Sequence, residues 1–163
     1  MILALLLPLP SCASYGSLFE EHTEEISEET QSYDTASTIV FSQSRYIFTG
    51  DTNAISPAGS SFYIIKGGTY KISGKLTDGN IIIDAEGECV RLVFCNLEIY
   101  CDSLTPIQVN NASEVIIETE AETKNTLECL DKSKTAILSQ AALTIVNNGT
   151  LSVNGLALYE NKT

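Results

Sequence analysis

The feature that most constrains the fold is a unit that occurs twice in the second half of the chain. Each copy holds three short apolar runs separated by small or polar residues. The runs are Thr105–Val109, Glu114–Ile117 and Asn125–Leu127 in the first copy, then Thr135–Ser139, Ala142–Ile145 and Gly149–Val153 in the second. The first runs are 30 residues apart and the second runs 28. Three short strands per repeat of this length are typical of one coil of a parallel β-helix, which buries its apolar face by stacking on the next coil.

The rest of the chain from about Thr38 onward supports an all-β fold. It contains a series of short β-type runs separated by Gly, Asn, Asp and Ser, with few helical signals. A β-sandwich is the alternative, but its strands are longer and alternate strictly between core and solvent. The run Ile81-Ile82-Ile83 does not alternate. We therefore expect a short solenoid of about four to five coils over residues 38–163, with residues 38–61 as a cap and with further coils missing at the C-terminal end.

The N-terminal segment predicts export. The apolar run in residues 1–12 is too short to span a bilayer as a helix, and its ending "LPSC" looks like a bacterial lipoprotein signal that places a lipid on Cys12. A plain secretory signal with a chance cysteine is the alternative. Residues 13–37 are acidic and poor in apolar side chains, which predicts a disordered tether. We expect a cell-surface lipoprotein or a secreted protein, with contact to a membrane only through the lipid.

Charge and cysteine content exclude two classes of partner. The net charge is −12, and the nine Lys and Arg residues form no cluster, so no nucleic-acid partner is expected. The body holds four cysteines without a Cys-x-x-Cys pair, and His22 lies in the tether, which argues against zinc. These cysteines, Cys89, Cys95, Cys101 and Cys129, are either disulfide-bonded or buried as free thiols, and we favour free thiols.

Four segments resemble one known family. They are "GGTYKISGKLTDGNIIIDA", "VRLVFCNLEI", "TPIQVNNASEVIIETEAETKNTL" and "LTIVNNGTLSVNG", and the resemblance that they carry covers about Phe62 to Gly155. They resemble the bacterial carbohydrate-binding domain family, known from clostridial cellulose- and pectin-binding β-helix proteins. The resemblance implies a right-handed parallel β-helix similar in shape to pectate lyases, export, binding of polysaccharides including acidic ones, and calcium.

Candidate site residues fall into two groups. Tyr63, Tyr70 and Tyr100 stand at strand positions beside polar residues and are candidates for binding sugar rings, with semi-buried packing as the alternative. Asp84, Glu86 and Asp102 are candidate calcium ligands in turns, because calcium takes carboxylate oxygens. For Asp84 we prefer a second role, as the residue that caps its own turn.

Two asparagine pairs are predicted to have a structural role. Asn110-Asn111 and Asn147-Asn148 are expected at equivalent turns of consecutive coils, where stacked side chains would stabilise the turns.

Catalysis is not expected from this sequence. The only histidine lies in the tether, so a Ser-His-Asp or Cys-His arrangement is excluded in the body. A lyase would need a basic residue such as Lys71, Lys75 or Arg91, and none lies in a recognisable motif. We predict non-catalytic polysaccharide binding at the bacterial cell surface, to cellulose or to acidic, pectin-like glycans. The alternatives are a pectate-lyase-type enzyme and a structural adhesin that binds a protein.

Overall fold

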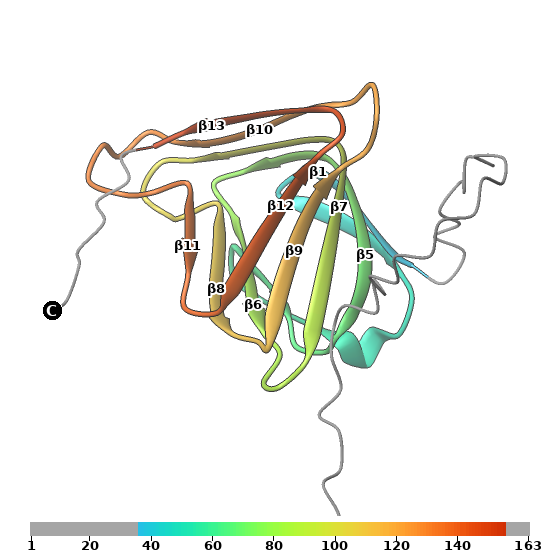
Figure 1. The fold of residues 1–163 in the computed structure, drawn as a ribbon. Helices are drawn as coiled ribbons and strands as arrows, with labels where there is room; N and C mark the ends of the chain where they lie inside the picture. Colours follow the sequence, from blue (N-terminus) through green and yellow to red (C-terminus); the bar gives the residue numbers. More distant parts are fainter. Residues whose placement is uncertain (1–35, 156–163) are drawn as a thin grey trace, which may run out of the picture. The chain divides into compact units, whose positions relative to one another are not determined.

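The computed structural model describes residues 36–155, and within them the chain forms β-strands, one short 3-10 turn and no α-helix (Figure 1). The elements are β1 (Ser37–Gln43), β2 (Arg45–Thr49), η1 (Thr52–Ala54), β3 (Ile55–Ala58), β4 (Ser61–Ile64), β5 (Gly68–Thr77), β6 (Asn80–Asp84), β7 (Cys89–Cys101), β8 (Ile107–Asn111), β9 (Glu114–Thr119), β10 (Lys124–Cys129), β11 (Ile137–Ser139), β12 (Ala142–Asn147) and β13 (Thr150–Asn154). The parallel solenoid expected from the repeat is confirmed. In this part of the chain, no helix has the length and apolar character needed to cross a membrane.

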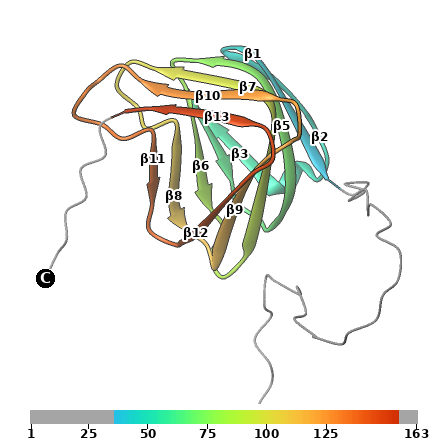
Figure 2. The same ribbon diagram turned by 45° about the horizontal axis from the view of Figure 1, so that its top comes forward.

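The strands stack into three faces. The first face holds β4, β6, β8 and β11; the second holds the first halves of β5 and β7 with β9 and β12. The third face holds the second halves of β5 and β7 with β10 and β13, which lie side by side in Figure 2. The stack makes about three turns over residues 36–155, where four to five coils were expected. Each face carries parallel neighbours, so every coil buries its inner side chains against the next one.

The strand register explains the three consecutive isoleucines. Ile81 and Ile83 point into the core and are fully buried. Ile82 points outward, yet it is only 6% exposed, because it lies between Tyr63 of β4 and Gln108 of β8 in the same ladder. Apolar side chains on both sides of a short strand are therefore compatible with a solenoid face that neighbouring rungs cover.

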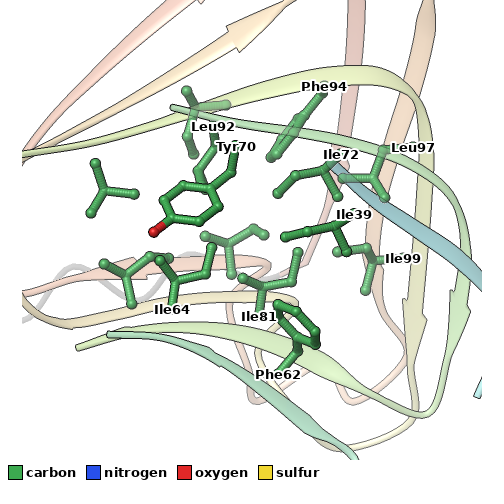
Figure 3. Close-up of a cluster of buried hydrophobic side chains, with 14 of the residues drawn as sticks. Ile39, Phe62, Ile64, Tyr70, Ile72, Ile81, Leu92, Phe94, Leu97 and Ile99 are labelled. Carbon is green, nitrogen blue, oxygen red and sulfur yellow. The ribbon is translucent and has the colours of Figure 1, made fainter. Parts of the chain in front are cut away.

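The core is a column of side chains from all three faces. Figure 3 shows Ile72, Leu92 and Phe94 of the second face together with Leu97 and Ile99 of the third. Each of these side chains is fully buried. The column is continuous because the parallel register puts each inward side chain directly against its counterpart one coil away.

The repeat read from the sequence matches the register for two of its three strands. β8 and β11 pair Ile107 with Ile137, and β9 and β12 pair Glu114 with Ala142, at the expected spacings of 30 and 28 residues. In the third strand Leu127 pairs with Val153, whereas the sequence pattern aligned it with Leu151. The two alignments differ by two residues, and since side chains alternate with a period of two, the same side chains still face the core.

The predicted asparagine pairs are not equivalent. Asn110 and Asn111 end β8 on the first face, and Asn147 ends β12 on the second face. They bond to other partners: Gln108 Nε2 donates to Asn110 Oδ1 at 2.7 Å, and Thr119 Oγ1 donates to Asn147 Oδ1 at 2.7 Å. The expectation of a ladder between them was wrong, because similar Asn-Asn sequences can follow different strands of a coil.

The N-terminal end of the solenoid is closed by antiparallel strands. β1 continues the parallel stack beside β5, and β2 then folds back on β1. β3 does the same beside β4 on the first face. An antiparallel strand at the end of a parallel stack leaves no place where a further coil could be added. This arrangement fits the cap expected over residues 38–61. β1 begins at Ser37, one residue before the predicted domain start. The predicted signal, the lipid on Cys12 and almost all of the predicted tether lie outside the described residues.

Three of the four cysteines in residues 36–155 are free thiols. Cys101 and Cys129 are buried opposite one another on β7 and β10, and Cys95 is partly exposed. Cys89 is not one of these free thiols, so the favoured expectation is confirmed for Cys95, Cys101 and Cys129 alone. Burial, above all, raises the pKa of Cys101 to about 12, and its Sγ donates to the carbonyl oxygen of Gly79 at 2.7 Å. Burial likewise raises the pKa of Tyr70 to about 12.

These two pKa values predict a loss of stability in alkaline solution. Between pH 9 and 12 the unfolded chain ionises at Cys101 and Tyr70 while the folded chain keeps both protons, so the free energy of the unfolded state falls relative to that of the folded state. The stabilisation is complete below pH 9 and is lost as the pH rises through the folded values. We expect the free energy of unfolding to fall by about 2 kcal/mol between pH 9 and 10.5. Urea unfolding followed by circular dichroism measures it. Cys101→Ala should reduce this slope, and an unchanged slope would contradict the assignment.

Candidate functional site

A groove of about 600 Å³ lies on the outer side of the third face, next to the N-terminal cap. Its lining comes from β5, the turn after it, the end of β7 and the β1–β2 turn. The lining residues are Gln43, Ser44, Lys75, Thr77, Asp78 and Tyr100. Amide, hydroxyl, carboxylate and ammonium groups therefore surround one aromatic ring. A concave site of this volume with an aromatic wall and a few polar groups suits a small polar ligand.

Strand alternation puts these side chains on the outside. Lys75 pairs with Glu98 and Thr77 pairs with Tyr100 across β5 and β7. The residues between them, Leu76 and Ile99, point inward and are buried. The sequences "KLT" and "EIY" thus each contribute two outward polar or aromatic side chains around one core residue.

The turn between β5 and β6 is held against the end of β7. Asp78 has a φ of +54°, and its backbone N–H donates to the carbonyl oxygen of Tyr100 at 2.9 Å. At Gly79 a Cβ atom would lie 2.6 Å from the carbonyl oxygen of Ser60, so the turn passes too close to its neighbour for any side chain. The rim of the groove is therefore fixed by backbone contacts.

Among the described residues that line the groove, Lys75 carries the only cationic group. It lies 4.8 Å from the centroid of the Tyr100 ring and 3.8 Å from the Glu98 carboxylate. The Lys75 and Glu98 side chains are 54% and 47% exposed. A solvent-exposed pair of this kind contributes about 0–1 kcal/mol, and an exposed cation–π contact contributes about as much. The ammonium is therefore held weakly and can move aside for a ligand that stacks on the ring.

Only one of the three predicted tyrosines lies in the groove. Tyr100 lies there, and Tyr63 lies on the outer side of the first face, beside Ile82. Tyr70 points into the core in Figure 3, is 1% exposed, and donates its hydroxyl proton to the carbonyl oxygen of Lys66 at 2.8 Å. The prediction of a ligand contact for Tyr70 was wrong, because the inward side of β5 carries it.

Sequence reasoning missed the partners of Tyr100 in the groove. Gln43 and Ser44 come from the β1–β2 turn, more than 50 positions before Tyr100, and only the β1–β5 pairing brings them close. Thr77 and Asp78 lie in one of the segments that resemble the family, but neither was a candidate for binding sugar rings. The outward alternation of "KLTDG" could have indicated them, whereas nothing local points to the β1–β2 turn.

The predicted calcium ligands do not form one site. Asp84 ends β6, Glu86 lies in the following turn, and Asp102 follows β7 at another corner of the coil. Across residues 36–155, no three His, Cys, Asp or Glu side chains are placed together to hold a metal ion. Calcium needs six to eight oxygen ligands around one point, so these three acids do not fit it. The capping role of Asp84 stays a prediction.

The three basic residues considered for lyase chemistry each face a carboxylate. Lys71 Nζ lies 2.7 Å from Glu120 Oε1, and Arg91 donates to Glu118 Oε2 at 3.1 Å on the same face. Lys75 faces Glu98, as described above. The hydrogen bond to Glu120, first among the causes, raises the pKa of Lys71. A lysine with a raised pKa keeps its proton at neutral pH and is a poor general base.

Comparison with known proteins gives one family and one solved structure. Residues 58–159 match the family described as carbohydrate-binding domain-containing protein. The solved structure is titled as that of a polysaccharide lyase-like protein from C. thermocellum, as a gadolinium derivative; it shares 26% sequence identity with a TM-score of 0.68. The match covers 74% of this chain and 55% of that protein, so the chain corresponds to about half of its length. A search of curated proteins found no match.

Proposed function

The chain belongs to the carbohydrate-binding domain-containing family, and from this premise we propose that its solenoid binds polysaccharide at the Tyr100 groove without cleaving it. The observation that carries the proposal is the outward Tyr100 ring, set among hydroxyl, amide and carboxylate groups in a cavity of about 600 Å³. A sugar ring offers apolar C–H faces and a rim of hydroxyls. An aromatic wall with polar neighbours matches both parts.

Replacing Tyr100 is expected to weaken glycan binding about tenfold, since truncating an aromatic anchor commonly costs about 1–2 kcal/mol. Tyr100 pairs with Thr77 at the surface, and so Tyr100→Ala should leave the core intact. Retention of the full chain on cellulose and on polygalacturonate, followed by titration with the retained glycan, measures the effect. Tyr63→Ala is the matched control, because it removes a partly exposed tyrosine from the first face.

Two results would contradict this proposal. One is the absence of retention on any polysaccharide. The other is an equal loss of affinity in the Tyr63 and Tyr100 variants, since the groove would then have no special part in binding. Tyr100→Phe should bind nearly as well as the unsubstituted chain if the ring face, and not the hydroxyl, makes the contact.

The role of calcium can be tested in the same retention experiment. We propose that calcium, as implied by the family resemblance, takes part in glycan binding; Asp84, Glu86 and Asp102 do not gather around one ion. Retention measured with and without a chelator tests this point. A chelator that lowers retention would support calcium bound at a place formed together with the glycan, and unchanged retention would remove calcium from the proposal.

A polysaccharide lyase is the second candidate, favoured by the similarity to a protein titled polysaccharide lyase-like. Release of unsaturated uronides from polygalacturonate, followed by ultraviolet absorbance, is the test. The pairing of Lys71, Lys75 and Arg91 with carboxylates supports binding over cleavage. We expect no absorbance increase, and Lys71→Ala should leave that baseline unchanged.

The proposed place of action is the cell surface. This part of the proposal rests on residues 1–12, where the apolar run and Cys12 predict a lipid anchor. Labelling of cells with a radioactive fatty acid, followed by isolation of the protein, tests it. Cys12→Ser should abolish the label, and a label that persists would place the lipid elsewhere.

A further inference from the structure

A second cavity adjoins the groove on the other side of the β5–β6 turn. It has a volume of about 290 Å³ and shares Ser44, Thr77 and Asp78 with the groove. Its other lining residues are mostly apolar or hydroxyl-bearing: Phe41, Tyr46, Pro57, Gly59, Ser60, Ser61, Phe62, Leu76 and Gly79. The three shared residues line both cavities, so the cavities border one another there, and we call Thr77 and Asp78 the ridge between them. A ligand that fills the groove and crosses this ridge enters the second cavity directly.

Tyr46 gives the second cavity the same kind of wall that Tyr100 gives the groove. Tyr46 is 43% exposed, so its large aromatic ring is accessible to a ligand. The ring packs edge-on against Phe62 at a centroid distance of 5.0 Å, and Phe62 in turn packs against Phe41 at 5.5 Å. Phe41 and Phe62 are buried, so Tyr46 rests on a rigid base. An aromatic ring fixed in this way loses little conformational entropy on binding.

The charges around both cavities favour an uncharged ligand. Within the part of the chain that the structure describes, Asp78 is the only charged residue that lines the second cavity. On the outer side of the third face, strand pairing puts Arg45, Ser42, Lys75 and Glu98 in one ladder, and Thr77, Tyr100 and Glu128 in the next. Two cations thus face three carboxylates when Asp78 is included. A polyuronate needs a surplus of positive charge that this surface does not supply.

We propose that the Tyr46 cavity is the second subsite of the glycan site, and that the ligand is a chain of uncharged sugar units crossing the Thr77–Asp78 ridge. This inference rests on the proposed function of the Tyr100 groove. The groove takes the first units of the chain, and the Tyr46 cavity takes the units that follow. Affinity therefore depends on the length of the glycan until both cavities are filled.

The test is titration calorimetry of the full chain with cello-oligosaccharides of two and six glucose units, and with polygalacturonate fragments of matched length. The hexasaccharide should bind about tenfold more tightly than the disaccharide, as expected for one added aromatic contact. Tyr46→Ala should remove this difference and leave disaccharide binding unchanged. Ile47→Ala, at a neighbouring position of β2 that is 69% exposed and outside both linings, is the matched control.

Several outcomes would overturn the subsite while leaving the proposed function intact. Equal affinity for both lengths, or an unchanged hexasaccharide affinity in Tyr46→Ala, would exclude the second cavity. Tighter binding of the polygalacturonate fragments, weakened by added salt, would overturn the uncharged ligand. If Tyr46→Ala lowers the thermal midpoint, Tyr46→Phe, which keeps the ring, should restore both the midpoint and the length dependence. Failure of every oligosaccharide to bind would instead contradict the proposed function itself.

Discussion

Replacing Gly74 by alanine is expected to lower the free energy of unfolding by about 3 kcal/mol, a large share of the stability of a domain of this size. Gly74 lies where β5 turns from the second face to the third, with a φ of +88°. A side chain there is strained in its own backbone, at a cost of about 1–3 kcal/mol. Its Cβ would also overlap the carbonyl oxygen of Phe41 on the neighbouring strand β1. Backbone cannot move aside as a flexible side chain can, so β1 and β5 must separate.

Gly87→Ala is the matched control for this prediction. Gly87 also has a positive φ, +70°, but a Cβ added there would meet nothing within 4 Å. Its cost should be the backbone strain alone, about 1 kcal/mol. Urea unfolding followed by circular dichroism compares the two, since the chain has no tryptophan for fluorescence. Equal losses in both variants would show that the contact with Phe41 is relieved at little cost.

The same substitution connects the corner of the coil to the proposed site. Lys75 and Thr77, one and three residues after Gly74, line the groove, and Gln43 reaches it from the end of β1. A separation of β1 from β5 would move these groups relative to one another. We therefore expect Gly74→Ala to weaken glycan binding as well, whereas Gly87→Ala should not.

The sequence allowed the fold to be predicted because the repeat and the strand period are local properties. Ile107 and Ile137 carry the 30-residue spacing on their own, and their pairing in β8 and β11 follows from it. The third strand was misaligned by two residues because a two-residue slip keeps the same side chains inward. Hydrophobic pattern alone cannot distinguish such registers. The difference was decided by the length of the turns, which the sequence pattern does not fix.

The candidate site was harder to predict because it depends on which side of a strand each residue occupies. Tyr70 and Tyr100 both stand in β-type runs beside polar residues, yet Tyr70 is inward and Tyr100 outward. The sequence around Tyr70 gives no reference for the inward side, since Gly68 and Gly74 interrupt the alternation. The second ring, Tyr46, lies in a hairpin that only the closing of the N-terminal end brings beside Phe62.

The asparagine that stabilises the fold was also not predicted from the sequence. The pairs chosen from the sequence, such as Asn110-Asn111, lie at or next to strand ends, and all of their residues except the partly exposed Asn110 are exposed. The asparagine that supports a corner is Asn125, which is 1% exposed. Its Oδ1 accepts from the Leu97 backbone N–H at 2.9 Å, and its Nδ2 donates to Thr123 Oγ1 at 3.0 Å and to the Thr150 carbonyl oxygen at 3.2 Å. It therefore joins three consecutive coils at one corner.

Asn125→Ala is expected to lower the free energy of unfolding by about 2–4 kcal/mol. The substitution leaves the Leu97 N–H without its acceptor in a buried place, and an unsatisfied buried group costs about 1–3 kcal/mol by itself. Loss of the two donor bonds adds to this cost. Asn110→Ala is the control; Asn110 is partly exposed and accepts one bond, from Gln108 Nε2, so its loss should be about 0.5 kcal/mol.

A second substitution separates the two halves of this network. Asn125→Asp keeps an oxygen for the Leu97 N–H but removes both donor bonds and places a buried carboxylate against the Thr150 carbonyl oxygen. Because an uncompensated buried charge is costly, we expect Asn125→Asp to lose at least as much stability as Asn125→Ala above the carboxyl pKa, and less below it. Leu97 begins the half of β7 that carries Glu98 and Tyr100, directly after Asn96, whose φ is +56°. Because Asn125 fixes this corner, its removal should also weaken binding at the Tyr100 groove. Full glycan affinity in a folded Asn125→Ala variant would show that the third face holds its shape without the buried amide.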